Sequence, residues 1–163
     1  MSQLSYKEVM IVMGSQSDWP CMSGATEVLS ELEIPFQAYV VSAHRTPDRL
    51  YEFATQAEQM GTKVIIAGAG GSAHLPGMIA AISHLPVVAV PVKSRFQDGL
   101  DSLLSIVQMP RGVAVATQGI GEMGAYNAGL YAAQILSVHD ARLFEKFANW
   151  RKEKFSKVPL EVE

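Results

Sequence analysis

Three short polar segments each follow an apolar run, and their side chains suit proton transfer and anion binding. They are "GSQSD" (14–18), "SAHR" (42–45) and "GAGGSAH" (68–74). Imidazole exchanges protons near neutral pH, and a guanidinium can hold a phosphate through two parallel hydrogen bonds. The residue types therefore predict a site in which a histidine moves a proton beside a bound anion.

The segment "GSQSD" stands between a predicted strand and a predicted helix N-terminus, where backbone N–H groups and the helix dipole attract anions. The hydroxyls of Ser15 and Ser17 add donors for a phosphate, and the carboxylate of Asp18 suits a ribose diol. The alternative is that Ser17 or Asp18 only caps the helix. The segment favours a ribose phosphate, with a purely structural cap as the competing interpretation.

The other two segments carry the histidines. In "SAHR", His44 suits acid–base work and Arg45 suits phosphate binding, and the alternative is an exposed loop without a function. In "GAGGSAH", glycines after a strand are typical of a phosphate loop. His74 is then either incidental to that loop or part of the wall of a catalytic pocket, and the residues alone leave both interpretations open.

The composition narrows the class of protein. The chain has 163 residues, 48% of them apolar, and a net charge of −3, which predicts one domain whose partner is a small molecule rather than nucleic acid. Cys21 is the only cysteine, which excludes an intrachain disulfide and fits a reducing compartment. The N-terminus has no signal-peptide pattern, so we expect a cytoplasmic protein.

The chain alternates apolar strands with helices. Strands are predicted over 8–13, 36–41, 63–67, 87–90 and 113–117. Among the helices that follow them, one begins after Asp18, one begins at Pro47 with Thr46 as its N-cap, and the last two cover about 123–138 and 140–155. Five strand–helix units with nearly all-apolar strands indicate an α/β fold: a single-domain, three-layer, doubly wound parallel five-stranded sheet, flavodoxin-like, with an extra C-terminal helix.

Residues 64–92 contain no charged side chain and are long enough to cross a bilayer. Their glycines, prolines and histidines instead favour a buried strand, a loop, a buried helix and a second strand. The helix "PGMIAAIS" (76–83) has no polar face, so we expect it to need cover on every side.

The expected fold also predicts where the polar segments meet. Doubly wound sheets bind ligands outside the carboxyl ends of their strands, at the point where the strand order reverses. With the order 2-1-3-4-5, the loops that carry Asp18, His44 and His74 converge at that point.

Other patterns carry less functional information. "GIGEMG" (119–124) matches a dinucleotide-binding pattern but follows the fifth strand, so a non-catalytic nucleotide-binding module is the weaker alternative. The histidines show no spacing typical of metal ligands, and no metal or other cofactor is predicted. We expect His84 and His139 to be structural or surface residues, and the small residues of 124–136 to serve packing.

Four blocks in order along about 8–155 resemble one enzyme family: "MGSQSDW", "VVSAHRTPD", "VIIAGAGGSAHLPGMIAA" and "DSLLSIVQMPRGV". They are similar to class I 5-(carboxyamino)imidazole ribonucleotide mutases of purine biosynthesis. Departures from the family pattern are Ser72, where a small apolar residue is expected, and the run over 118–131. The resemblance implies one mutase domain over 1–163, with a core of about 8–155 and a tail of 156–163.

The resemblance also implies a reaction. The carboxyl group moves from the exocyclic amine of the ribonucleotide to ring carbon 4 by decarboxylation, retention of carbon dioxide and recarboxylation, without ATP, biotin or metal. In this scheme His44 is the proton shuttle, His74 orients the carboxylate, and the glycine loop forms a closed chamber. The implied substrate-binding residues are Ser15, Ser17, Asp18, Ser42, Arg45, Ala69, Gly70, Gly71 and Leu75.

The resemblance further implies a homo-octamer that has neither a membrane nor a nucleic acid as a partner. A related carboxylase, which adds free carbon dioxide to aminoimidazole ribonucleotide, is the nearer alternative activity. The block "GAGGSAHLPGM" (68–78) favours the mutase.

Overall fold

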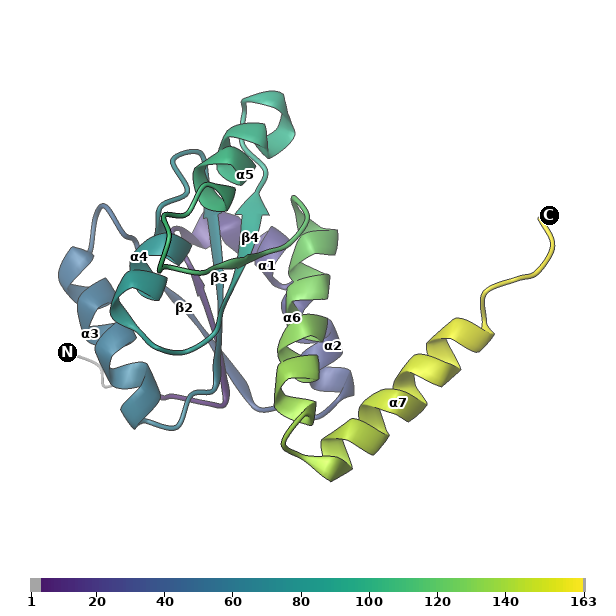
Figure 1. Ribbon diagram of the computed structural model, residues 1–163. Coiled ribbons are helices and arrows are strands. Elements are labelled where there is room, and N and C mark those ends of the chain that lie inside the picture. The colour runs from purple at the N-terminus through teal and green to yellow at the C-terminus, as the bar shows by residue number, and fades with distance from the viewer. Residues whose placement is uncertain (1–3, 163) are drawn as a thin grey trace.

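The computed structural model describes residues 4–162, which form a five-stranded parallel sheet between two layers of helices (Figure 1). The strands are β1 Val9–Met13, β2 Phe36–Val40, β3 Val64–Gly70, β4 Val87–Val92 and β5 Ala116–Thr117. Their order is β2-β1-β3-β4-β5, so the predicted fold class and strand order are confirmed. Residues 1–3 and 163 of the predicted domain lie outside the described range.

Helices cover both faces of the sheet, which explains the continuous apolar strands. The helices are α1 Trp19–Met22, α2 Gly24–Glu31, α3 Pro47–Gln59, α4 Leu75–Ile82, α5 Leu100–Val107, α6 Glu122–Ser137 and α7 Ala141–Ser156. Figure 1 shows α3 and α4 on one face, α1, α2 and α6 on the other, and α7 projecting away from the sheet. Because water reaches neither face, β1 and β4 are buried at every residue.

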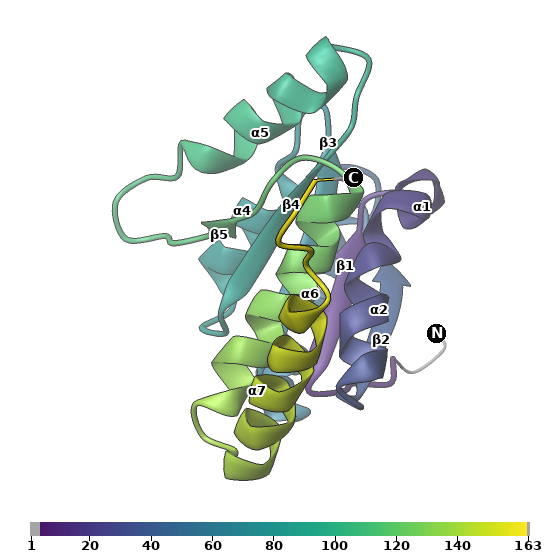
Figure 2. The same ribbon diagram turned by 90° about the vertical axis from the view of Figure 1, so that its right-hand side faces the viewer.

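The small residues of α6 allow a close contact with α2, and the two helices lie side by side in Figure 2. A Cβ atom on Gly129 would lie 2.5 Å from the carbonyl oxygen of Ala25, so the backbones approach closely. Ala128 and Ala132 on the same helix are fully buried. The predicted packing role of this segment is confirmed.

The helix predicted after Asp18 is divided in the structure. Residues Gln16–Asp18 form a 3-10 turn, α1 ends at Met22 and α2 begins at Gly24. The hydroxyl of Ser23 donates to the carbonyl oxygen of Pro20 at 3.2 Å, at the junction between the two helices. Ser23 keeps helical backbone angles, but the N–H of Thr26 donates to the carbonyl oxygen of Ser23, three residues back, at 2.9 Å, so the regular ladder is interrupted there.

The fifth strand is shorter than the predicted 113–117, because only Ala116 and Thr117 pair with β4. The segment before it passes over α4, where the side chain of Met109 fills the space left by Gly77. Val115 packs against the core on the α3–α4 side of the sheet. The apolar residues of this segment therefore contact that core instead of extending the strand.

Within this chain the helix predicted at 76–83 is covered on one face only, so its apolar sequence still needs the expected cover on the other face. Leu75 and Ile79 of α4 are buried, whereas Met78 is 36% exposed and Ala81 is exposed. A helix in an outer layer presents only one face to the sheet, and the other face needs a different cover. Within residues 4–162, no helix is long and apolar enough to cross a membrane.

Candidate active site

A cavity of about 460 Å³ opens at the carboxyl edge of the sheet, at the junction between β1 and β3 where the strand order reverses. Segments that follow four different strands contribute to its wall. The lining residues are Gly14, Ser15, Asp18, Ser42, Ala43, His44, Arg45, Ala69, Gly70, Ser72, His74, Leu75, Lys93 and Ser94. The predicted convergence of the three polar segments is therefore observed at the expected edge.

The segment after β1 is fixed by a reciprocal cap. The N–H of Ser17 donates to Oγ of Ser15 at 3.3 Å, and the N–H of Ser15 donates to Oδ2 of Asp18 at 3.1 Å. Ser15, rather than Ser17 or Asp18, is therefore the N-cap residue of the 3-10 turn. Asp18 belongs to this capping arrangement and also lines the cavity.

The environment of Asp18 is unusual for a carboxylate. Burial raises its pKa, and the hydrogen bonds from Ser15 and Ser17 together with the charge of Arg45 only partly oppose this rise.

Burial also raises the pKa of the nearby Cys21 thiol to about 11. A thiol with that pKa stays protonated at neutral pH, so Cys21 is not suited to act as a nucleophile.

Arg45 ties the segment after β2 to the segment after β1. Its Nη2 donates to the carbonyl oxygen of Gly14 at 2.9 Å, and its Nε donates to Oγ of Ser42 at 3.2 Å. Thr46 is the N-cap residue of α3, as predicted, but its hydroxyl bonds the backbone of Ser42 instead of the helix N–H groups. These bonds fold residues 42–46 into a compact turn that presents His44 to the cavity.

The two cavity histidines contact one another. Nε2 of His44 lies 2.8 Å from Nδ1 of His74, and the rings meet edge to face with 83° between their planes. One nitrogen must donate a proton that the other accepts, so these two nitrogens share a single proton. The sequence placed both histidines at the same sheet edge, and the structure adds their direct contact.

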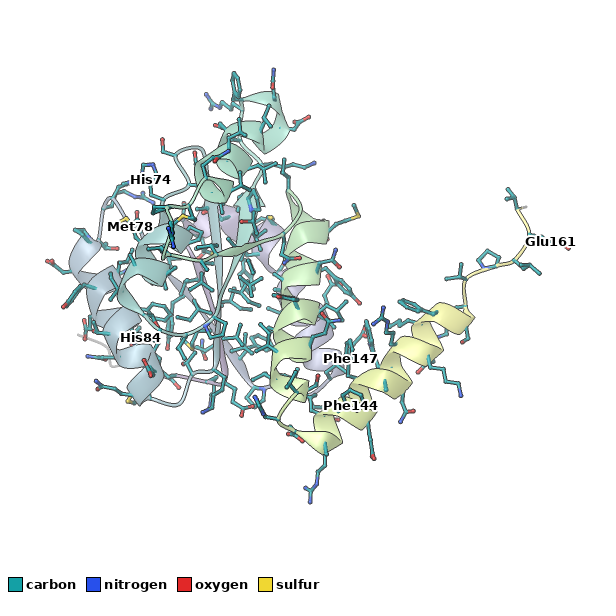
Figure 3. The ribbon with its side chains drawn as sticks, viewed as in Figure 1. His74, Met78, His84, Phe144, Phe147 and Glu161 are labelled. Atoms are coloured by element: carbon teal, nitrogen blue, oxygen red, sulfur yellow. The ribbon has the colours of Figure 1, made fainter. Side chains whose placement is uncertain are left out.

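His74 reaches this position because of the turn that follows β3. Gly71 has a φ of +67°, a left-handed conformation that glycine adopts without the strain of a Cβ atom. The N–H groups of Ala73 and His74 then donate to the carbonyl oxygens of Gly71 and Ser72, at 2.8 Å each. His74 becomes the N-cap residue of α4, and Figure 3 shows its side chain at the upper end of that helix, with His84 near the opposite end.

The structure brings most of the predicted site residues to the cavity wall, but not all of them. Ser17 and Gly71 do not line the cavity. Ser17 bonds Ser15, which does line it, and Gly71 accepts from the N–H of Ala73 in the turn that leads to His74. His84 and His139 lie on the surface away from it, as predicted.

Five of the lining residues were not among the site residues predicted from the sequence. These are Gly14, Ala43, Ser72, Lys93 and Ser94. Lys93 and Ser94 directly follow β4. Ligands in such sheets bind outside the carboxyl ends of the strands, so this rule predicts both residues when it is applied to the fourth strand as well as the first three. Lys93 adds a second cationic side chain to a wall in which Asp18 is the single carboxylate among the lining residues.

No group of three or more histidine, cysteine, aspartate or glutamate residues suited to a metal ion is found among the residues that the structure describes. The polar side chains that line the cavity carry imidazole, carboxylate, hydroxyl, guanidinium and ammonium groups.

The chain is similar to known proteins over most of its length. The chain is 57% identical over 150 residues to the N5-carboxyaminoimidazole ribonucleotide mutase of Escherichia coli K12, covering 92% of this chain and 89% of that protein. It is 58% identical over 153 residues to the mutase of the same name from Bacillus subtilis 168, covering 94% of each. The crystal structure of Treponema denticola PurE superposes with a TM-score of 0.83 at 26% identity, covering 91% of this chain and 92% of that one.

The family model described as AIR carboxylase matches residues 8–157, which include every residue lining the cavity. With this match and the identities above, the chain belongs to the AIR carboxylase family.

Proposed function

We propose that this protein is an N5-carboxyaminoimidazole ribonucleotide mutase, an isomerase of purine biosynthesis. The observation that carries this conclusion is the identity of 57% and 58% to two relatives of that name over more than nine tenths of this chain. The activity is assigned to the whole chain, residues 1–163, acting as one domain. The product is the ribonucleotide with the carboxyl group on carbon 4 of the imidazole ring.

The segments after β1 and β2 bind the ribose phosphate in this proposal. Ser15, Ser42 and Arg45 hold the phosphate, with Ser17 supporting Ser15 through a hydroxyl bond of 2.9 Å. Asp18 accepts hydrogen bonds from the ribose hydroxyls. The support is that Ser15, Ser42 and Arg45 present hydroxyl and guanidinium donors to the cavity, and that the Arg45 bonds hold the two segments together.

His44 carries the proton in the proposed reaction. It gives a proton to the exocyclic nitrogen as the bond from that nitrogen to the carboxyl carbon breaks, which leaves a free amine and carbon dioxide. The electron-rich ring then attacks carbon dioxide through carbon 4. Neutral His44 removes the proton from carbon 4 and restores the aromatic ring, so the proton gained replaces the one given.

His74 and the glycine loop hold the migrating group. His74 donates a hydrogen bond to the carboxylate, and its contact with His44 keeps the acceptor and the proton carrier in the same part of the cavity. Ala69, Gly70, Gly71 and Leu75 form or support the wall beside the reacting atoms. Small side chains leave room for carbon dioxide and exclude water, which retains the gas between the two steps.

Two substrates tested separately distinguish this function from the carboxylase reaction. Purified protein is given either N5-carboxyaminoimidazole ribonucleotide alone, or aminoimidazole ribonucleotide with bicarbonate, both without ATP and with a chelator present. We expect rapid formation of the 4-carboxy product from the first substrate, with a His44→Asn protein as the blank. A higher kcat/KM with the second substrate would assign the carboxylase reaction, and loss of activity with the chelator would contradict a metal-free mechanism.

We also propose that the enzyme is a cytoplasmic homo-octamer. The support is the apolar surface that a single chain leaves uncovered, which includes Met78 of α4 and, on the projecting α7, Phe144 and Phe155 at 59% and 58% exposure. Exposed apolar surface of this kind marks contacts with other chains. Light scattering at micromolar concentration tests the assembly, and a single species at the monomer mass of 17.7 kDa would contradict it.

A further inference from the structure

A buried serine of α5 connects two backbone segments at the edge of the cavity. The side chain of Ser102 is fully inaccessible to solvent. Its Oγ donates to the carbonyl oxygen of Val92 at 2.7 Å and accepts from the N–H of Gly71 at 2.9 Å. One hydroxyl therefore joins the end of β4 to the turn that follows β3, and it uses both its donor and its acceptor in doing so.

Ser102 is itself fixed by the residues around it. Its N–H donates to Oδ1 of Asp101 at 2.8 Å, and the same carboxylate oxygen accepts from the hydroxyl of Ser94. Ser105, one turn further along α5, has its hydroxyl 2.7 Å from the carbonyl oxygen of Asp101 and 3.2 Å from that of Gly71. A network from the start of α5 thus reaches both polar groups of Gly71. The bond from Gly71 to Ser102, at 2.9 Å, is shorter than the one from Ser105 to Gly71, at 3.2 Å.

The position of Gly71 determines the position of His74. Two backbone hydrogen bonds restrict the chain between these residues. The N–H of Ala73 donates to the Gly71 carbonyl, and the N–H of His74 donates to the Ser72 carbonyl. A shift of the Gly71 peptide is therefore passed on to the His74 ring and to its 2.8 Å contact with His44.

We infer that Ser102 is a positioning residue for the reaction, because its hydroxyl fixes the Gly71 peptide and, through the turn, the His74 imidazole and the glycine wall of the cavity. This assignment rests on the proposed function. Ser102 is absent from the cavity wall, so it acts through Gly71 rather than by touching the substrate. Without the hydroxyl, the Gly71 N–H and the Val92 carbonyl both lose their partner, and the turn relaxes.

The experiment compares Ser102→Ala with a matched control, Ser137→Ala. Ser137 is also a buried helical serine, but its hydroxyl donates to the carbonyl of Gln134 within α6, away from the cavity. We expect Ser102→Ala to lower kcat by about 10- to 100-fold while KM changes by less than about threefold, because misplacement of a catalytic group affects the chemical step most strongly. The control is expected to retain the kcat of the unmodified protein.

Hydrogen exchange gives a readout that does not depend on turnover. In Ser102→Ala, the amides of residues 71–74 should exchange faster while those of β1 and β3 stay protected. A second pair, Ser102→Thr and Ser102→Val, has nearly equal side-chain volume and differs in the hydroxyl, so only the threonine variant should recover kcat and protection. If the site does not tolerate any of these side chains, Gly71→Ala tests the same turn, because its added Cβ meets no atom within 4 Å but strains the positive φ.

The outcomes separate this inference from the proposed function. An unmodified protein that fails to convert the carbamate ribonucleotide overturns the proposed function. An active unmodified protein, with Ser102→Ala matching Ser137→Ala in kcat and in exchange at 71–74, overturns the role of Ser102 alone. If Gly71→Ala is the only variant that folds, a kcat equal to that of the unmodified protein also overturns the role of Ser102.

Discussion

The close contact between α2 and α6 predicts that a larger side chain at Gly129 lowers the stability of the fold. In Gly129→Ala, the new methyl group would lie 2.5 Å from the carbonyl oxygen of Ala25 and 2.7 Å from Cγ1 of Val28. Carbon atoms in a packed core prefer contacts of about 3.5–4.0 Å, so the helices must separate by roughly 1 Å. Ala25 and Val28 are both fully buried, and the carbonyl belongs to the backbone, so neither group can simply turn aside.

Two opposing effects determine the size of the change. Alanine is favoured over glycine inside a helix by about 0.5–1 kcal/mol, which would stabilise α6. Overpacking a core costs about 1–3 kcal/mol, and the clash with a backbone atom places this position in the upper half of that range. We therefore expect a net loss of about 1–2.5 kcal/mol in the free energy of unfolding, which lowers Tm by about 2–10 °C in a chain of this length.

Thermal unfolding followed by circular dichroism measures this loss, at one fixed protein concentration because self-association also raises the apparent Tm. The control is Gly119→Ala, in which the nearest atom to the added Cβ is 3.9 Å away. Its Tm should change by no more than about 1–2 °C, as for most surface substitutions. A Gly129→Ala protein as stable as the control would refute the close approach of the two helices.

Three further predictions concern the cavity. His44→Asn should lower kcat by about two to four orders of magnitude, the usual contribution of a positioned acid–base group, and a variant with nearly unchanged kcat would exclude His44 as the proton carrier. Arg45→Lys should raise KM by about 10- to 100-fold, because lysine cannot reproduce the guanidinium bonds to phosphate and protein; steady-state kinetics test this, and an unchanged KM would count against phosphate binding. The pKa of Asp18 is raised in the folded state, so ionisation opposes folding, and stability is lost as the pH rises from the unfolded to the folded pKa. The Tm of Asp18→Asn minus the Tm of the unmodified protein should therefore increase as the pH rises through this window. A Tm difference that does not vary with pH would contradict the raised pKa of Asp18.

The sequence by itself determined the architecture and the edge at which the chemistry lies. The continuous apolar runs at β1, β3 and β4 require cover on both faces, which helix layers on the two sides of a parallel sheet provide. Because all strands of such a sheet point in one direction, the residues that follow them meet at one edge. The presence of His44, Arg45 and His74 together in the cavity wall follows from this rule and from their places along the chain.

Only the tertiary structure decided which atoms touch at that edge. The contact between His44 and His74, the bridge from Ser102 to Gly71 and the short β5 join residues about 30 positions apart. The resolved geometry also shows Lys93 at the cavity and one face of α4 left open. Local propensity and hydrophobic period determine which type of element a segment forms and which of its faces is buried. The distance between two side chains depends instead on how loops close and helices pack, and these are fixed by contacts that the whole chain makes at once.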